Sequence, residues 1–363
     1  MNIFIMILLS FSMVGLIDKI QGNRWKLAQE FDKGLSAMGS LAISISGIYC
    51  VGITLVRTYA GTISGWTEGM LVDPSIVIGC LLAPDLGAPF LTAELSSNPN
   101  LGYFSGVVVA GCLGQFTSFQ LPVLFSALEE KEKGPMMKGF LHGIFAIPIG
   151  LLAGGVLLGL PVKEILINIS LISVVCFVLA MAFMKFSSIV EKTMITFGKF
   201  IGYGSQLMFA IVVVGLFIPG WKVVDDVLVH EILTILIKMV VIICGGLVLA
   251  NLCLRYLKRQ LSWVAEKMNT NDFAIMGLLL NSINSLVIVA LIPKMDKRGK
   301  RMNAAFAVSG AYLLGGQMVF VLSIGNSRVF YAYFFSKLIA GIASIIISMG
   351  VNRRNRSLPK KSA

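Results

Sequence analysis

The chain has 363 residues, of which 56% are apolar and only 13% are charged, and its mean hydropathy is +0.87. Because about a quarter of the residues of a soluble domain are charged, this composition excludes an ordinary soluble fold. The net charge of +12 does not indicate nucleic-acid binding, since the basic residues occupy short gaps between apolar runs instead of one continuous face.

Long apolar runs recur from one end of the chain to the other. A helix of roughly 20 apolar residues crosses about 30 Å of hydrocarbon. The sequence therefore predicts an all-α polytopic membrane protein with about nine transmembrane helices, near residues 1–18, 34–56, 102–128, 139–160, 164–184, 195–219, 231–254, 303–323 and 329–350. We expect the first run to be retained as a span, because it has neither a basic start nor a small-residue cleavage site.

Two further apolar runs are interrupted at mid-length. Residues 74–95 contain Ala83-Pro84-Asp85-Leu86-Gly87, and residues 273–292 contain Asn281-Ser282-Ile283-Asn284-Ser285. Proline and short polar side chains break a helix at such points. We predict two re-entrant helical hairpins, each of which enters the membrane and turns back.

The distribution of basic residues favours this topology. If both hairpins turn back, 24 of the 30 Lys and Arg residues lie on the cytoplasmic side, four lie outside and two lie within spans. Full crossings would reduce this asymmetry. We therefore place the N-terminus outside and the C-terminus in the cytoplasm, with one membrane transport domain over residues 1–352 and a basic cytoplasmic tail over residues 353–363.

The two hairpins would open toward opposite sides of the membrane, which predicts an inverted repeat. Residues 198 positions apart are identical at several places, namely Met70 and Met268, Gly79 and Gly277, Leu81 and Leu279, and Leu82 and Leu280. Transporters built from inverted repeats bind their substrate near the bilayer midplane, where two such hairpins would meet.

Polar residues at the two breaks are candidate site residues. An ionisable side chain at membrane depth is costly, so Asp85 either binds a solute or caps the second half of the first hairpin. Asn281, Asn284 and Ser285 either bind a hydroxyl or amine group of the solute, or only satisfy the interrupted backbone.

Four residues outside the breaks complete the candidate site. Glu94 either contacts the solute or is a solvated carboxylate at the membrane interface. Gln115 and Gln317 either line a polar cavity or join helices by hydrogen bonds. Lys337 lies deep in the last span and needs a carboxylate or carbonyl partner inside the bundle, for which we expect Asp85 or Glu94.

The sequence carries no motif for catalysis or for a bound cofactor. The six cysteines show neither a C-x-x-C pair nor Cys/His spacing, so we expect no metal site. His142 and His230 are the only histidines, and no nucleotide-binding loop is present. We therefore expect a transporter that uses no ATP and no cofactor, and not an enzyme.

Several stretches of the chain resemble one family, the EutH-like ethanolamine-utilisation membrane transporters. The matching stretches are GLSAMGSLAI (34–43), PSIVIGCLLAPDLG (74–87) followed by Glu94-Leu95, IPIG (147–150) with AGG (153–155), KMDKRGK (294–300) followed by NAAFAVS (303–309), and KLI (337–339) with Gly341.

This resemblance implies an ethanolamine permease of the bacterial cytoplasmic membrane. The family's motif has an aspartate at the position of Asp85 and an asparagine at that of Asn284, but Asp-His where this chain has Gly316-Gln317. A protonated amino alcohol suits a carboxylate beside amide and hydroxyl groups. A more distant similarity to concentrative nucleoside transporters implies an elevator-like motion and a homo-oligomer.

Other functions remain open from the residues alone. One alternative is transport of another small polar solute, such as a nucleoside. The alternative from a different class is a membrane-embedded sensor or scaffold that transports nothing.

Overall fold

The computed structural model describes residues 3–59, 62, 71–118, 120, 128–221, 223–256, 258–283 and 285–357. Within these ranges every regular element is helical, as predicted. The α-helices are α1 (Ile3–Ile20), α2 (Ala28–Gly47), α3 (Ile53–Thr58), α5 (Ser75–Leu81), α6 (Ala88–Leu95), α7 (Pro99–Tyr103), α8 (Glu130–Leu157), α9 (Val162–Lys185), α10 (Ser187–Phe217), α11 (Asp226–Tyr256), α12 (Lys258–Lys267), α13 (Asp272–Ile283), α14 (Lys297–Ser309), α15 (Gly316–Ile324) and α16 (Ser327–Ser357).

Two π-helical segments extend these helices. Ile48–Gly52 joins α2 to α3, and Phe104–Gly114 continues α7 into the centre of the molecule. Short 3₁₀ turns occur at Pro84–Leu86, Pro219–Trp221, Ser285–Ala290 and Ile292–Lys294. The π-helical segment Phe104–Gly114 is buried along its whole length, so it forms the axis against which other elements pack.

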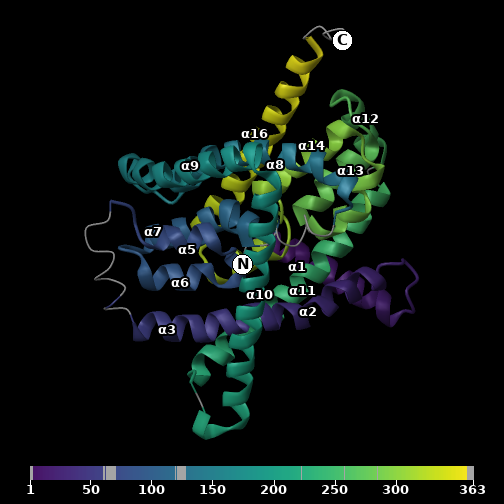
Figure 1. Ribbon diagram of the computed structural model, residues 1–363. Coiled ribbons are helices and arrows are strands. Elements are labelled where there is room, and N and C mark those ends of the chain that lie inside the picture. Colours follow the sequence, from purple (N-terminus) through teal and green to yellow (C-terminus); the bar gives the residue numbers. More distant parts are fainter. Residues whose placement is uncertain are drawn as a thin grey trace.

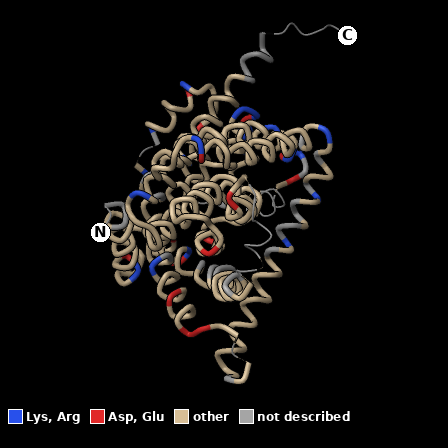
Figure 2. Tube along the Cα trace, turned by 90° about the vertical axis from the view of Figure 1, so that its left-hand side faces the viewer, with Lys and Arg blue, Asp and Glu red and all other residues tan. Residues whose placement is uncertain are grey.

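Four helices in the described part of the chain are long and apolar enough to cross a membrane. They cover Lys131–Leu157, Val162–Ala182, Asp226–Leu249 and Ser327–Gly350. Each overlaps one of the spans expected from the sequence. Charged residues are sparse along the traced chain, and most of the tube in Figure 2 carries none.

The span expected over residues 303–323 is not one unbroken helix. Helix α14 ends at Ser309 and α15 begins at Gly316. In the intervening loop Tyr312 adopts the left-handed region with φ 58°, and its N–H donates to the Asn281 carbonyl oxygen at 3.1 Å. Leu314 N–H donates to Ser282 O at 2.7 Å. The apolar composition concealed this break because α13 supplies the hydrogen bonds that the helix gives up.

Glycine is required where this loop meets α13. A Cβ built on Gly315 would lie 1.9 Å from the carbonyl oxygen of Ile283, which is far inside van der Waals contact. The loop backbone and the end of α13 can therefore approach this closely only without a side chain at position 315.

The first expected break lies where the sequence placed it. Helix α5 ends at Leu81, a 3₁₀ turn covers Pro84–Leu86, and α6 begins at Ala88 after Gly87, whose φ is 89°. Helix α6 packs against both α5 and α7 (Figure 1), and α5 and α6 both pack against the segment Phe104–Gly114. The run is therefore divided into two helices that contact each other.

The second expected hairpin is only half α-helical. Helix α13 covers its first half, but the second half is made of the two 3₁₀ turns from Ser285 to Lys294. The sequence did not indicate this change from α-helix to 3₁₀ turns, although its residue types are consistent with it. Val287, Ile288 and Val289 are β-branched and disfavour the α-helix, and Pro293 removes a backbone donor.

Two residues 198 positions apart cap corresponding helices. Asn98 precedes α7, and its side chain accepts a hydrogen bond from Leu101 N–H at 3.0 Å. Asp296 precedes α14, and its carboxylate accepts from Gly299 N–H at 3.2 Å. Both residues therefore begin the helix that follows one of the broken runs.

The glycines Gly79 and Gly277 make corresponding close approaches. A Cβ on Gly79 would lie 2.2 Å from the backbone oxygen of Ser105, and a Cβ on Gly277 would lie 2.6 Å from the side-chain oxygen of Asn303. Ser105 and Asn303 are also 198 positions apart. In each half, the first helix of the broken run thus packs closely against the helix that follows the run.

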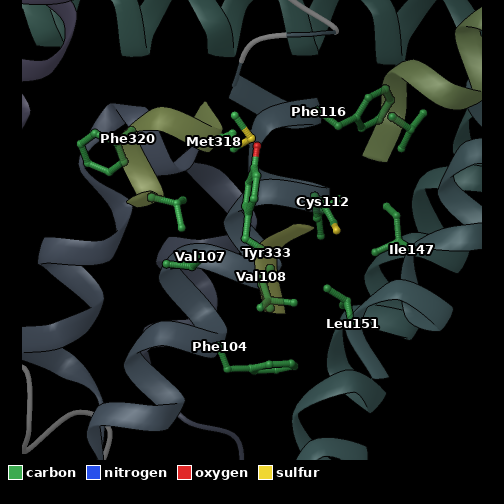
Figure 3. Close-up of a cluster of buried hydrophobic side chains, with 14 of the residues drawn as sticks. Phe104, Val107, Val108, Cys112, Phe116, Ile147, Leu151, Met318, Phe320 and Tyr333 are labelled. Carbon is green, nitrogen blue, oxygen red and sulfur yellow. The ribbon is translucent and has the colours of Figure 1, made fainter. Parts of the chain in front are cut away.

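The core around the central π-helical segment is apolar and dense. Val107 and Cys112 from that segment pack with Ile147 of α8, Met318 of α15 and Tyr333 of α16, all of which are buried. Figure 3 shows the Tyr333 ring in the middle of this cluster. Elements far apart in the sequence are therefore held around one axis.

Candidate functional site

Asp85 lies in the break between α5 and α6 and keeps part of its surface accessible. Its Oδ1 accepts a hydrogen bond from Nε2 of Gln317 at 3.2 Å. Gln317 is buried in the first turn of α15, directly after the loop that interrupts the predicted 303–323 span. The break in the first hairpin and the unexpected break therefore meet at one hydrogen bond.

Lys337 is fully buried on α16. Its Nζ donates to the carbonyl oxygen of Gly111, lies 3.5 Å from Oε1 of Gln317, and stands 5.3 Å from the ring centroid of Tyr333. We expected Asp85 or Glu94 as the partner of Lys337, but the ammonium donates to the Gly111 carbonyl oxygen and reaches Asp85 only through Gln317. A cation enclosed in this way is stabilised by the carbonyl dipole and by the face of the aromatic ring.

Gln317 connects the two charged side chains. Its amide N–H points to the carboxylate of Asp85, and its amide oxygen faces the ammonium of Lys337. An amide held at both ends has one orientation only, because turning it over would place a donor against the cation and an acceptor against the anion. A change of charge at Asp85 therefore alters the hydrogen bond that holds the Gln317 amide in this orientation.

The second break contains a network of amides and hydroxyls. Asn281 is fully buried; its Nδ2 donates to Asn303 O at 3.0 Å, and its Oδ1 accepts from Ser285 Oγ at 2.5 Å. Gln120 donates from Nε2 to the same Ser285 oxygen at 2.6 Å. Asn281 thus joins the second break to the backbone of α14, and Ser285 links Asn281 to Gln120. The remaining candidate in this break, Asn284, lies outside the described residues.

Gln115 joins the central π-helical segment to α14. Its Nε2 donates to the carbonyl oxygens of Ala307 and Val308, at 3.0 and 2.5 Å. Its Oε1 is buried and has no hydrogen-bond partner among the described residues. Of its two expected roles, the hydrogen bond between helices is present, and one acceptor remains for another group.

Glu94 lies apart from this polar centre. It is exposed in the last turn of α6, whereas Asp85 precedes the first turn of the same helix. The structure therefore brings Asp85, Gln317 and Lys337 together, and places Glu94 at the other end of α6.

Several residues of this centre were missed from the sequence. Gly111 contributes only its backbone oxygen, which no pattern of side chains reveals. Tyr333 precedes Lys337 by one helical turn, so this spacing was a usable signal for a cation–aromatic pair. Gln120 lies in the run predicted as a span over residues 102–128, five positions after Gln115, and a second amide in an apolar run was also a signal.

Comparisons with known proteins agree in one family. The model of the family described as "Ethanolamine utilisation protein, EutH" matches residues 1–351. A protein of Listeria monocytogenes named "Probable ethanolamine permease EutH" is 27% identical over 366 residues, which cover 100% of this chain and 96% of that protein. No solved structure matches the chain.

Two more relatives have similar sequence identities to this chain. "Uncharacterized protein YxeR" of Bacillus subtilis is 28% identical over 94% of this chain and 92% of its own length. "Probable ethanolamine permease EutH" of Escherichia coli is 27% identical over 88% of this chain and 84% of its own length.

Proposed function

This chain belongs to the EutH family of ethanolamine utilisation proteins, and on that premise we propose that it transports ethanolamine across the bacterial cytoplasmic membrane as a secondary transporter or facilitator. The observation that carries the proposal is the chain of contacts from Asp85 through Gln317 to Lys337. Asp85 is an anion at a helix break, and Lys337 is the cation that balances it through Gln317. We infer that the ammonium group of the solute replaces this cation.

The proposed transport cycle uses the positive charge of the solute. In the empty site, Asp85 is balanced by Lys337 through the Gln317 amide. An ammonium group that reaches the partly accessible Asp85 forms a charge-assisted hydrogen bond, which is stronger than the bond from a neutral amide. Lys337 then relies on Gly111 and Tyr333 alone. The solute hydroxyl contacts the second break at Asn281, Asn284 and Ser285, with Gln115 and Glu94 as further candidate contacts.

The proposed topology keeps nine spans and two re-entrant runs, with the N-terminus outside and the C-terminus in the cytoplasm. The excess of Lys and Arg on one side supports this orientation. The matching caps Asn98 and Asp296, and the matching close approaches of Gly79 and Gly277, support an inverted repeat with residues 1–352 as a single transport unit. A homo-oligomeric scaffold is part of the same proposal.

Uptake of labelled ethanolamine into proteoliposomes tests this function. We expect uptake by the unaltered chain and its loss in Asp85→Asn, whose amide cannot balance an ammonium group. Asp32→Asn is the matched control, because Asp32 pairs with Lys19 at the surface. Absence of uptake by the unaltered chain would reject the substrate. Equal uptake by Asp85→Asn and the unaltered chain would remove Asp85 from the mechanism.

A further inference from the structure

A cavity of about 330 Å³ runs along α6 from Pro89 to the loop that follows the helix. It is bordered by α6, by the loop that follows it, by α7 and by the last residue of α15. Its lining combines aromatic and polar groups, among them Phe90, Ser96, Ser97, Asn98 and Tyr103. Such a volume is more than enough for a small organic ion with several waters.

Two helices connect this cavity to the polar centre. Helix α6 starts close to Asp85 and presents Pro89, Phe90 and Ala93 to the cavity. Helix α15 starts with Gln317 and ends at Ile324, which also lines the cavity. Both helices therefore have one end at the Asp85–Gln317 hydrogen bond and the other end at the cavity.

An aromatic contact joins α6 to α15 between these two ends. The Phe90 ring meets the Tyr49 ring edge-on, with centroids 4.3 Å apart and planes at 88°. It meets Phe320 of α15 in the same manner, at 5.7 Å and 90°. Tyr49 and Phe320 are buried, whereas Phe90 retains accessible surface and borders the cavity. Phe90 is therefore the member of the trio with room to turn.

The electrostatics of the cavity favour a cation. Helices α6 and α15 both end there, and the C-terminal end of a helix carries partial negative charge. Helix α7 begins there, but the Asn98 side chain already accepts from its Leu101 N–H. Glu94 follows Phe90 by one helical turn, so its exposed carboxylate flanks the same face of α6.

We propose that this cavity is a second binding site, for a small organic ammonium ion, and that the Phe90 ring separates it from Asp85. An ion held among the aromatic rings and hydroxyls of the cavity gains attraction from the ring faces without losing all its water. Rotation of Phe90 away from Phe320 then opens the way to Asp85. This inference rests on the proposed function only in naming Asp85 as the destination.

The first arm of the test measures charge selectivity in the cavity. Ala93→Cys in isolated membranes is labelled with 2-(trimethylammonium)ethyl methanethiosulfonate or with the anionic 2-sulfonatoethyl reagent, and rates are corrected for reaction with a free thiol. We expect the cationic reagent to react roughly tenfold faster. Added ethanolamine should slow labelling by the cationic reagent. The same protection is expected in the double variant Ala93→Cys, Asp85→Asn, in which the Asp85 site is lost. Equal corrected rates without protection would overturn the proposal. The unaltered chain reports labelling of its native cysteines.

The second arm tests the role of Phe90. The cationic reagent is applied to Asp85→Cys alone and combined with Phe90→Ala. We expect Phe90→Ala to accelerate labelling about tenfold, since thiol reactivity follows access. Leu91→Ala is the matched control, because it removes a neighbouring buried side chain of α6 from outside the cavity lining. Equal acceleration by both truncations, or by neither, would contradict a separating role for Phe90. Neither arm uses ethanolamine uptake, so failure of the transport assay stays distinguishable from failure here.

Discussion

Gln317 donates its amide N–H to Asp85 at 3.2 Å, and in doing so joins two breaks that are more than two hundred residues apart in the sequence. One end of the amide is committed to an anion and the other faces the cation of Lys337. This relationship makes definite predictions for each of the three side chains.

Gln317→Leu is expected to keep the volume of the side chain and to remove the bridge. Leaving a buried polar partner unsatisfied costs about 1–3 kcal/mol, so we expect ethanolamine uptake to fall by roughly 5- to 150-fold. The measurement is initial uptake in proteoliposomes at matched protein content. Ser323→Ala, a change on the same helix, should leave uptake within about twofold, because it removes only a bond to the Val319 carbonyl. A Gln317→Leu chain with normal uptake would exclude the bridge from the mechanism.

Lys337→Met and Asp85→Asn are expected to compensate each other in stability. Removing the cation alone leaves the Asp85 carboxylate without the charge that it faces through Gln317. Because the two charges are not in direct contact, we expect a loss below the roughly 3 kcal/mol of a broken buried pair. The double variant should recover most of this loss while transport remains absent. Thermal unfolding in detergent of the four chains measures the coupling. Strictly additive changes would show that the two charges do not sense each other through Gln317.

Glu132→Gln is expected to destabilise the fold without a direct effect on the site. Glu132 pairs with Lys300 between α8 and α14, and their side chains are only 5% and 12% exposed. Loss of one partner should lower the unfolding free energy by about 3 kcal/mol. Asp32→Asn removes the exposed pair with Lys19 and should change it by under about 1 kcal/mol. Similar losses in the two variants would argue against the buried pair as a structural anchor.

Gly79→Ala is expected to prevent correct packing of α5. Its Cβ would lie 2.2 Å from a backbone oxygen of Ser105, and backbone cannot move aside as a side-chain tip can. Gly202→Ala is the control, since nothing lies within 4 Å of its Cβ and alanine favours a helix by up to about 1 kcal/mol. The yield of monodisperse protein after detergent extraction measures both, and a normal yield for Gly79→Ala would contradict the packing of α5 described above.

The sequence predicted the helical class and the first break because both depend on local chemistry. Runs of apolar residues are visible without any tertiary information, and Pro84 with Gly87 marks a break by itself. The break between α14 and α15 could not be predicted in this way. Its amides are satisfied by carbonyl groups of α13, so no polar residues were needed in the loop to signal it.

The sequence indicated the polar residues of the candidate site, but it did not indicate which of them are joined by hydrogen bonds. Asp85, Gln317 and Lys337 stand out as polar residues in apolar runs, and the structure brings these three together. The order of the contacts depends on the loop before α15, which turns Gln317 toward Asp85. Asn281 was predicted as a polar residue at the second break, but its contacts with Asn303 and Ser285 were not. These contacts require the fold of the second half.

The loop before α15 has an evolutionary consequence. Tyr312 and Leu314 in this loop are bonded to the last residues of α13, and α15 leads from there directly to the amide on Asp85. A replacement that shifts the backbone at the end of α13 is therefore expected to move the loop that leads to Gln317, even though it touches neither charge. Among homologues, residues at these three places are expected to covary, and adaptation to a different solute is expected to require paired changes in both halves of the chain.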